Sequence, residues 1–372
     1  MLFTIDKDSL LNKLKIVEKI TAQRGNVQPV LANVLFEVKD NVLNLSATDL
    51  EISVKSKTTV AVKKEGKITL PAKKLLEIAA KLPDKPVEFS LNEDNNIVSI
   101  ICGNSKFEII GISAQEFPKI DDEMPSATEI EIDAQPFLKA IKNTVYAAAN
   151  YENRNIISGV FCKIDENGLE MAATDGNRLT VIVENIKNKI TKLTKLVIPS
   201  KTLNEFARIC SFINEETVSL IVDKSKLILK TMNFSLISRL IEGEYPPYSQ
   251  LIPKTTANTA IVSREELIGA IERVSPMVYD RTYIVKFTFS DNKLLLKAET
   301  PNSGTSEDVI DSNYKGDDLA IAFNYKYVLD SVRTMESENV KIGLNGSLSA
   351  TLFQPESEEK YICLIMPIQM RV

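Results

Sequence analysis

The chain has 372 residues, of which 44% are hydrophobic and 26% are charged, and its net charge at neutral pH is -5. This length predicts two or three domains with substantial cores, and no apolar run approaches the roughly 20 residues that cross a bilayer. Because histidine is absent, histidine-based catalytic triads and zinc sites are excluded.

The four cysteines and the first residues indicate where the protein resides. Cys102, Cys162, Cys210 and Cys363 are far apart, and three of them have apolar neighbours. Such thiols behave as small hydrophobic side chains, so we expect no disulfide framework, no metal site and no cofactor. The opening MLFTIDKDSLL lacks the features of an export signal. We therefore expect a soluble cytoplasmic protein that makes no membrane contact.

A strand followed by an amphipathic helix opens each third of the chain, at residues 2–20, 129–148 and 259–278. A second strand and helix follow in each third, at residues 67–82, 195–210 and 319–335. Stretches such as VLFEVKDNVLNLSA alternate apolar and polar residues around Asp, Asn or Gly, which predicts β-hairpins.

The repeat predicts an α+β protein of three similar domains, each with two helices packed against antiparallel sheets. The joins fall in the polar, proline-bearing stretches PKIDDEMPSAT and IPKTTANT. We therefore expect domains at residues 1–124, 125–254 and 255–372.

Five of the six expected helices carry basic residues opposite their apolar side. In the first helix Leu10, Leu14 and Val17 share one side, while Lys15 and Lys19 point away from it. The basic residues that this geometry places on outer helix faces are Lys15, Lys19, Lys73, Lys81, Lys139, Lys201, Arg208, Lys326 and Arg333. The helix that carries Glu265 and Glu272 is an exception. Solvated helices commonly carry lysines, but helices that line one surface would together attract phosphates without reading bases.

Three strings carry a resemblance to a known family. They are ATDGNRL in the second third, LIEGEYPPYSQLIP at its end, and IMPIQMRV at the C-terminus. With the threefold repeat, they make the whole chain similar to the bacterial DNA polymerase III beta subunit, the sliding clamp of replication. The resemblance implies the DNA clamp fold, with each chain a half-ring. It implies a head-to-tail homodimer that encircles double-stranded DNA without sequence specificity and gives the replicative polymerase processivity. Such a protein is cytoplasmic and associates with the nucleoid during replication.

The resemblance also implies a peptide-binding pocket between the second and third domains. Its expected partners are the replicative polymerase alpha subunit, the clamp loader, other DNA polymerases and repair proteins, all through short linear motifs. The matching residues are Ile157, Thr174, Gly176, Asn177, Arg178, Leu179, Pro246, Gln250, Leu251, Leu348, Leu364, Met366, Pro367 and Ile368. Gln250 replaces an arginine of the best-known members, and the C-terminus is one residue longer than the family's plain ending.

Two further sets of residues follow from the same resemblance. Arg24, in the loop after the first helix, is expected to touch DNA and to join the basic helix residues in lining the hole. Phe107 and Ile109 of one subunit are expected to meet Met277 of the other in the dimer contact. Each of these three residues is explained equally well as an ordinary core residue.

Alternative functions remain at this point. Asp175 and its counterpart Asp49 suit turns that hydrogen-bond their own backbone, which we favour over a catalytic or metal-binding role. Phosphate-loop and nucleophile-elbow motifs are absent, so we expect no enzyme. The remaining rival is a protein-interaction scaffold that does not encircle DNA, which would have no reason to repeat the basic helix faces.

Overall fold

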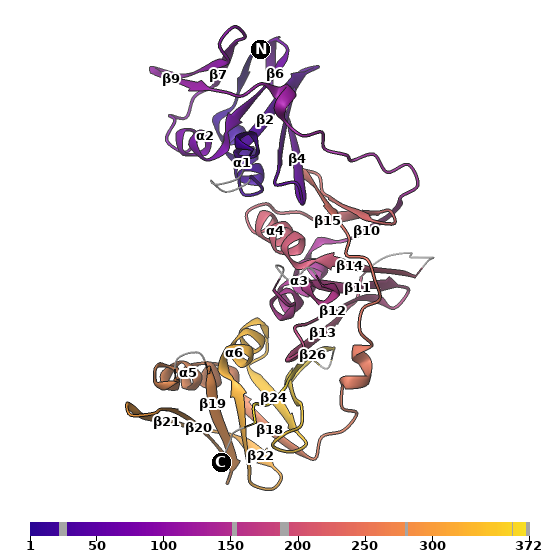
Figure 1. Ribbon diagram of the computed structural model, residues 1–372, viewed down its shortest axis with the longest axis vertical. Helices are drawn as coiled ribbons and strands as arrows, with labels where there is room; N and C mark the ends of the chain where they lie inside the picture. The colour runs from indigo at the N-terminus through magenta and orange to yellow at the C-terminus, as the bar shows by residue number, and fades with distance from the viewer. Residues whose placement is uncertain (22–27, 151–154, 187–192, 280–281, 359, 370–372) are drawn as a thin grey trace. The chain divides into compact units, whose positions relative to one another are not determined.

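The computed structural model describes residues 1–21, 28–150, 155–186, 193–279, 282–358 and 360–369. The chain forms two compact units, here called unit 1 (Met1–Ala134 with Lys201–Leu240) and unit 2 (Gln135–Ser200 with Ile241–Val372). Every strand pair in the described ranges is antiparallel. The α+β prediction is therefore confirmed, and each unit combines two sheets with helices (Figure 1).

Unit 1 contains a five-stranded and an eight-stranded sheet. The smaller sheet has the spatial order β5 (Ala61–Lys64), β1 (Leu2–Ile5), β7 (Val87–Asn92), β8 (Ile97–Cys102) and β9 (Ser105–Ile110). The larger sheet has the order β10 (Thr128–Asp133), β15 (Thr217–Val222), β16 (Lys226–Lys230), β17 (Phe234–Arg239), β4 (Ile52–Thr59), β3 (Val42–Thr48), β2 (Asn33–Lys39) and β6 (Gly66–Pro71). The pairing of β17 with β4 makes one continuous sheet from strands of the first and second thirds.

The helices of unit 1 are α1 (Lys7–Glu18), α2 (Ala72–Ala79) and α4 (Ser200–Cys210), the last from Lys201 onward. Helix α1 begins where the Asp6 carboxylate accepts the Ser9 amide at 2.9 Å, which satisfies a donor that the helix itself leaves free. Leu10, Leu14 and Val17 are fully buried, so the apolar face expected from the sequence is confirmed. Helices α1 and α2 contact each other, and α1 packs on β3 and β4.

Unit 2 repeats this plan. Its larger sheet has the order β14 (Thr194–Pro199), β11 (Gly159–Asp165), β12 (Gly168–Thr174), β13 (Arg178–Glu184), β26 (Tyr361–Ile365), β25 (Thr351–Pro355), β24 (Asn339–Leu344), β18 (Asn258–Ser263) and β22 (Asn313–Lys315). Its smaller sheet has the order β21 (Gly304–Asp311), β20 (Lys293–Thr300), β19 (Ile284–Ser290) and β23 (Leu319–Asn324). Here the pairing of β13 with β26 joins the second and last thirds.

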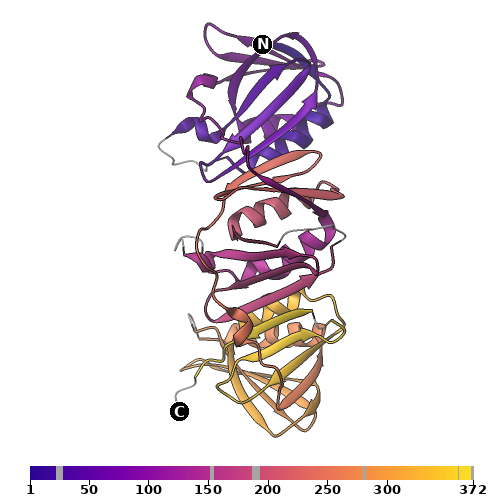
Figure 2. The same ribbon diagram turned by 90° about the vertical axis from the view of Figure 1, so that its right-hand side faces the viewer.

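Helices α3 (Ala134–Thr144), from Gln135 onward, α5 (Arg264–Val274) and α6 (Tyr325–Thr334) belong to unit 2. Helices α3 and α6 lie on one face of the nine-stranded sheet, and the short helix η6 (Tyr248–Leu251) lies on the other, in front of the strands in Figure 2. None of the helices in the described ranges is both long and apolar enough to span a bilayer.

All four cysteines are free and buried. Burial raises the pKa of Cys162 and of Cys210 to about 12, because a thiolate would lose its hydration. We expect the folded protein to resist thiol reagents such as DTNB at pH 8, and the protein unfolded in guanidinium to react at all four positions.

The raised pKa of Cys162 also predicts how stability depends on pH. The folded state is stabilised relative to the unfolded state while the Cys162 thiol stays protonated. This contribution is fully present below the ordinary thiol pKa of 9.0 and is lost as the pH rises toward 12. In that window the cysteine should lower the free energy of unfolding by about 1.4 kcal/mol per pH unit. Urea unfolding of Cys162→Ala between pH 8 and 10.5 should show a shallower decline than the unmodified protein, whereas equal slopes would contradict the assignment.

Candidate functional site

The ATDGNRL string forms a tight turn between β12 and β13. The Thr174 hydroxyl donates to the carbonyl of Arg178 at 2.6 Å and accepts the amide of Gly176 at 3.1 Å. The Oδ1 atom of Asp175 accepts the amides of Asn177 and Arg178 at 2.9 and 3.1 Å. Gly176 has φ +91°, a conformation that glycine adopts without steric cost. The first two side chains of the turn therefore fix its backbone.

The turn between β3 and β4 repeats these bonds. The Thr48 hydroxyl donates to the carbonyl of Ile52 and accepts the amide of Leu50, both at 3.0 Å. Asp49 Oδ1 accepts the amides of Glu51 and Ile52 at 3.0 and 2.8 Å. Leu50, at the position of Gly176, has φ +76°. Both aspartates thus act as turn residues. Across the described ranges, no group of three or more His, Cys, Asp or Glu side chains could hold a metal ion.

Arg178 connects this turn to helix α6. Its side chain is only 10% exposed. The Nε atom donates to Asp175 Oδ2 at 3.0 Å, and Nη1 donates to Asp330 Oδ2 at 2.7 Å. The other terminal nitrogen donates to the carbonyl of Tyr146, and the guanidinium lies 4.4 Å from the ring centre of Tyr327. The side chain is therefore occupied by contacts within the chain, which favours a positioning role at the predicted pocket.

An apolar cluster lies beside the turn, on the sheet face that η6 covers. Its buried members are Ala172, Leu179, Val181, Tyr248 and Leu364. Leu179 and Leu364 are direct partners in the pairing of β13 with β26. Strands far apart in sequence thus bring two predicted pocket residues together.

Two tyrosines of the YPPY segment complete the cluster, and neither was among the residues predicted for the pocket. Phe161, Tyr245 and Tyr248 form mutual ring contacts with centroids 5.6 to 6.2 Å apart. The Tyr245 hydroxyl accepts the Thr174 amide at 3.2 Å, and the Tyr248 hydroxyl donates to Glu170 at 2.5 Å. Burial raises the pKa of both hydroxyls, so they stay protonated. The sequence signal that could have identified them is a pair of tyrosines in a proline-rich connector. Tyrosine combines an apolar ring with a hydroxyl that needs a polar partner when it is buried.

The other predicted pocket residues lie at several depths. Leu251, Leu348 and Met366 are large apolar side chains that are exposed by 64%, 62% and 46%. The amide of Met366 donates to the carbonyl of Asn177 at 2.8 Å, so the segment after β26 runs beside the turn. Gln250 is exposed, whereas Pro246, Pro367 and Ile368 are partly buried. Ile157 lies in the short helix η5 (Ile156–Ser158), and neither it nor Leu348 belongs to the apolar cluster.

The predicted DNA-facing cations differ in how far they are neutralised. Lys15, Lys73 and Lys81 are exposed, and no carboxylate of the described residues lies within ion-pair distance of them. Lys19 is exposed and lies 3.6 Å from Glu18. Arg24 lies outside the described residues.

The predicted cations beyond the first third have intramolecular partners. Lys139 lies 2.9 Å from Glu184 and 3.0 Å from Glu358; burial opposes its charge, but these two carboxylates raise its pKa overall. The remaining contacts are Lys201 with Asp49 and Glu51, Arg208 with Glu205, Arg333 with Glu272, and Lys326 over the ring of Tyr283. Helical geometry identified the outward direction of these side chains but not their partners.

Two of the three predicted dimer residues lie on an edge strand. Phe107 and Ile109 are on β9, an edge strand of the five-stranded sheet. Ile109 is buried within unit 1, whereas its neighbour Ile110 is 72% exposed. Met277, in the short helix η7 (Ser275–Met277), is partly buried and accepts the Thr300 hydroxyl at its carbonyl at 2.7 Å.

Three family models match the chain in succession. They describe the N-terminal, central and C-terminal domains of the DNA polymerase III beta subunit, and they match residues 1–121, 131–247 and 249–369. The chain belongs to the DNA polymerase III beta subunit family. It therefore has the clamp fold of three similar α+β domains, as the sequence predicted.

Full-length relatives agree with this assignment. The chain is 30% identical over 385 residues to the beta sliding clamp of Synechocystis, and 28% identical over 381 residues to that of Bacillus subtilis, with at least 98% of each chain covered. Among solved structures, it superposes on the beta subunit of Thermotoga maritima with a TM-score of 0.91 at 29% identity, and on a Pseudomonas aeruginosa sliding clamp bound to griselimycin with 0.92 at 26% identity. Both superpositions cover all of each chain.

Proposed function

We propose that this protein is a DNA sliding clamp, in which two copies close head to tail into a ring that encircles double-stranded DNA. The observation that carries the proposal is the succession of all three family models along one chain. Relatives matched over nearly their whole length are named beta sliding clamps. In this function the protein holds the replicative polymerase on DNA by topology, so weak and non-specific contacts suffice, and no catalysis of its own is required.

The domain limits and the dimer contact belong to the same proposal. We place the limits at 124 and 254. The family matches support the first limit more closely, because residue 124 lies in the stretch 122–130 between two successive matches. Phe107, Ile109 and Met277 remain the proposed dimer residues. The edge strand β9 and the exposed Ile110 support a contact at that edge, because an unpaired apolar edge invites pairing with another chain.

Lys15, Lys73 and Lys81, which have no carboxylate within ion-pair distance among the described residues, are the strongest candidates for contact with DNA. We expect Lys73→Glu with Lys81→Glu to weaken binding to a short duplex and to flatten its salt dependence by about 2 in the slope of log K against log salt. Fluorescence anisotropy across a salt series measures this. The matched control is Lys39→Glu with Lys67→Glu, exposed residues on β2 and β6, which should leave the slope unchanged. Equal slopes for the two variants would show that Lys73 and Lys81 do not contact DNA.

The exposed apolar residues beside the buried cluster are the proposed peptide-binding surface. The exposed Leu251 shares the short helix η6 with the buried Tyr248, and the exposed Met366 follows the buried Leu364 by two residues. Exposed apolar side chains next to a fixed apolar cluster suit one or two hydrophobic anchors of a peptide. We propose that linear motifs of the polymerase alpha subunit, the clamp loader, other polymerases and repair proteins bind there. Clamps from Pseudomonas aeruginosa and Bartonella birtlesii have been solved bound to griselimycin, and we propose that this surface accepts the same compound.

Retention on circular DNA tests the ring and separates it from a scaffold. The protein is loaded onto a nicked circular plasmid by the clamp loader of the same organism and isolated by gel filtration, after which the plasmid is linearised. A clamp should remain on the circle and leave the linear form within minutes. A scaffold would be absent from the circle, and a sequence-specific binder would stay after cutting; either result would overturn the proposal.

A further inference from the structure

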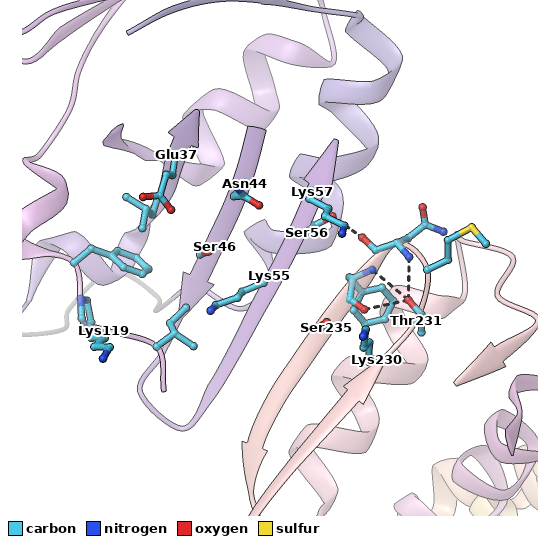
Figure 3. Close-up of a pocket in the computed structure, with 17 residues that line it drawn as sticks. Glu37, Asn44, Ser46, Lys55, Ser56, Lys57, Lys119, Lys230, Thr231 and Ser235 are labelled. Carbon is cyan, nitrogen blue, oxygen red and sulfur yellow. Dashed lines mark hydrogen bonds between the residues drawn. The ribbon is translucent and has the colours of Figure 1, made fainter. Parts of the chain in front are cut away.

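Unit 1 contains a pocket of about 580 Å³ on the outer face of its eight-stranded sheet (Figure 3). Its floor comes from β2, β3 and β4, one wall from connector residues 117–120, and the other wall from the turn at residues 230–235. All of these residues belong to unit 1. The pocket is separate from the peptide-binding surface of unit 2, and its volume is within the range of small-ligand sites.

Short polar side chains make up part of the floor. The strand register aligns Leu35, Ser46, Lys55 and Ser235 in one row across four strands. Ser46 and Ser235 stand on either side of Lys55, and Asn44 lies in the adjoining row, as Figure 3 shows. Because successive residues of a strand alternate between faces, the core beneath keeps its large residues while this outer face stays open.

Both walls are fixed in place, and each contributes apolar side chains. Phe117 packs with the buried Val30 and Leu31, and Ile120 packs against the same group. On the other side, Glu215 accepts hydrogen bonds from Thr231 at 2.9 Å and from Asn233 at 3.0 Å. Between these two anchored residues the Met232 side chain is 90% exposed. An exposed methionine on a rigid turn has no packing role, and it suits an adaptable contact with a partner.

The rim is strongly basic although the whole chain is acidic. Lys55, Lys57, Lys119 and Lys230 line the pocket together with one carboxylate, Glu37. Lys55 pairs with Asp122 at 2.5 Å. The other three lysines have no carboxylate within ion-pair distance in the part of the chain that the structure describes. Lys119 and Lys230 project from opposite walls in Figure 3, so a negatively charged occupant would be held from both sides.

We propose that this pocket binds a short acidic peptide segment of a partner protein, with an apolar side chain inserted between Phe117 and Met232 and carboxylates on the lysine rim. Charge complementarity favours an acidic occupant, because three of the four lysines that line the pocket have no carboxylate partner among the described residues, whereas the chain as a whole has a net charge of -5. This second docking site differs in chemistry from the surface of unit 2, whose exposed members are uncharged.

Anisotropy of a fluorescein-labelled, amidated peptide DEIDLDE titrated with the full chain tests the proposal without DNA or loader. We expect saturable binding that weakens at least tenfold in Lys57→Glu with Lys230→Glu, and also in Met232→Ser. The reversed-charge peptide KKIKLKK should not bind. Because Met232 is 90% exposed, its substitution should not affect folding. Met232→Ser therefore still tests the proposal if the charge-reversal variant is unstable.

A second comparison separates this proposal from the proposed function. Leu251→Ser with Met366→Ser should leave DEIDLDE binding unchanged, whereas loss in this variant would assign the peptide to unit 2. Absence of binding at millimolar protein, or equal binding to the Lys57 and Lys230 variant, would overturn the pocket. Displacement of the peptide as protein concentration rises, with a matching increase in mass by sedimentation, would identify a second copy as the occupant and would also overturn it.

Discussion

Replacing Arg178 with alanine is expected to lower the free energy of unfolding by about 3 kcal/mol, because it breaks a buried network. The substitution removes the ion pairs with Asp175 and Asp330 and the contact with the Tyr327 ring. It also leaves the Asp175 carboxylate, 15% exposed, without its cation. Urea unfolding followed by circular dichroism measures the loss.

Two further variants make this prediction specific. Arg178→Lys keeps the charge, but a lysine ammonium lacks the planar guanidinium that contacts Asp175, Asp330 and the Tyr146 carbonyl together. Most of the loss in the free energy of unfolding should therefore remain. Asp330→Asn should cost only about 1 kcal/mol, because the Asp330 side chain is 42% exposed and water replaces part of the interaction. A loss below 1 kcal/mol for the alanine variant would show that the network is not a main support of unit 2.

The sequence predicted those parts of the fold that depend on local periodicity. Alternation and helical spacing identified the hairpins and the buried face of α1, since Leu10 and Leu14 lie one turn apart. Periodicity tells which face of a strand is buried, but it does not tell which strand lies beside it. The continuation of the sheet through β4 with β17, and through β13 with β26, was therefore not foreseen.

The same limit applies to the functional side chains. Helical geometry placed Lys139 and Lys201 on outer faces, but their carboxylate partners Glu184, Glu358 and Asp49 come from distant strands and loops. Both cations are consequently less available to DNA than Lys73 and Lys81. For Arg178, the sequence motif predicted a role at the pocket. Its partners in α6, Asp330 and Tyr327, could not be predicted from the sequence and are seen only in the structure.

Replacing two exposed apolar residues with serine should abolish most peptide binding without unfolding the protein. Leu251→Ser with Met366→Ser removes two large apolar side chains of the proposed peptide-binding surface, and truncation of two central anchors weakens binding roughly 100-fold. The residues are 64% and 46% exposed, so the free energy of unfolding should change little. Calorimetric titration with griselimycin, or with peptides tiled across the polymerase alpha subunit, measures the loss.

The appropriate control is Met232→Ser, which removes a methionine of unit 1 that is 90% exposed and should leave griselimycin affinity unchanged. Leu179 and Leu364 are unsuitable for this test, because both are nearly fully buried and their truncation would create a cavity beneath the surface. If the double variant retains affinity within threefold while it keeps its stability, peptides must bind elsewhere on the protein. Loading onto circular DNA should also fall in the double variant, because the clamp loader is proposed to bind the same surface.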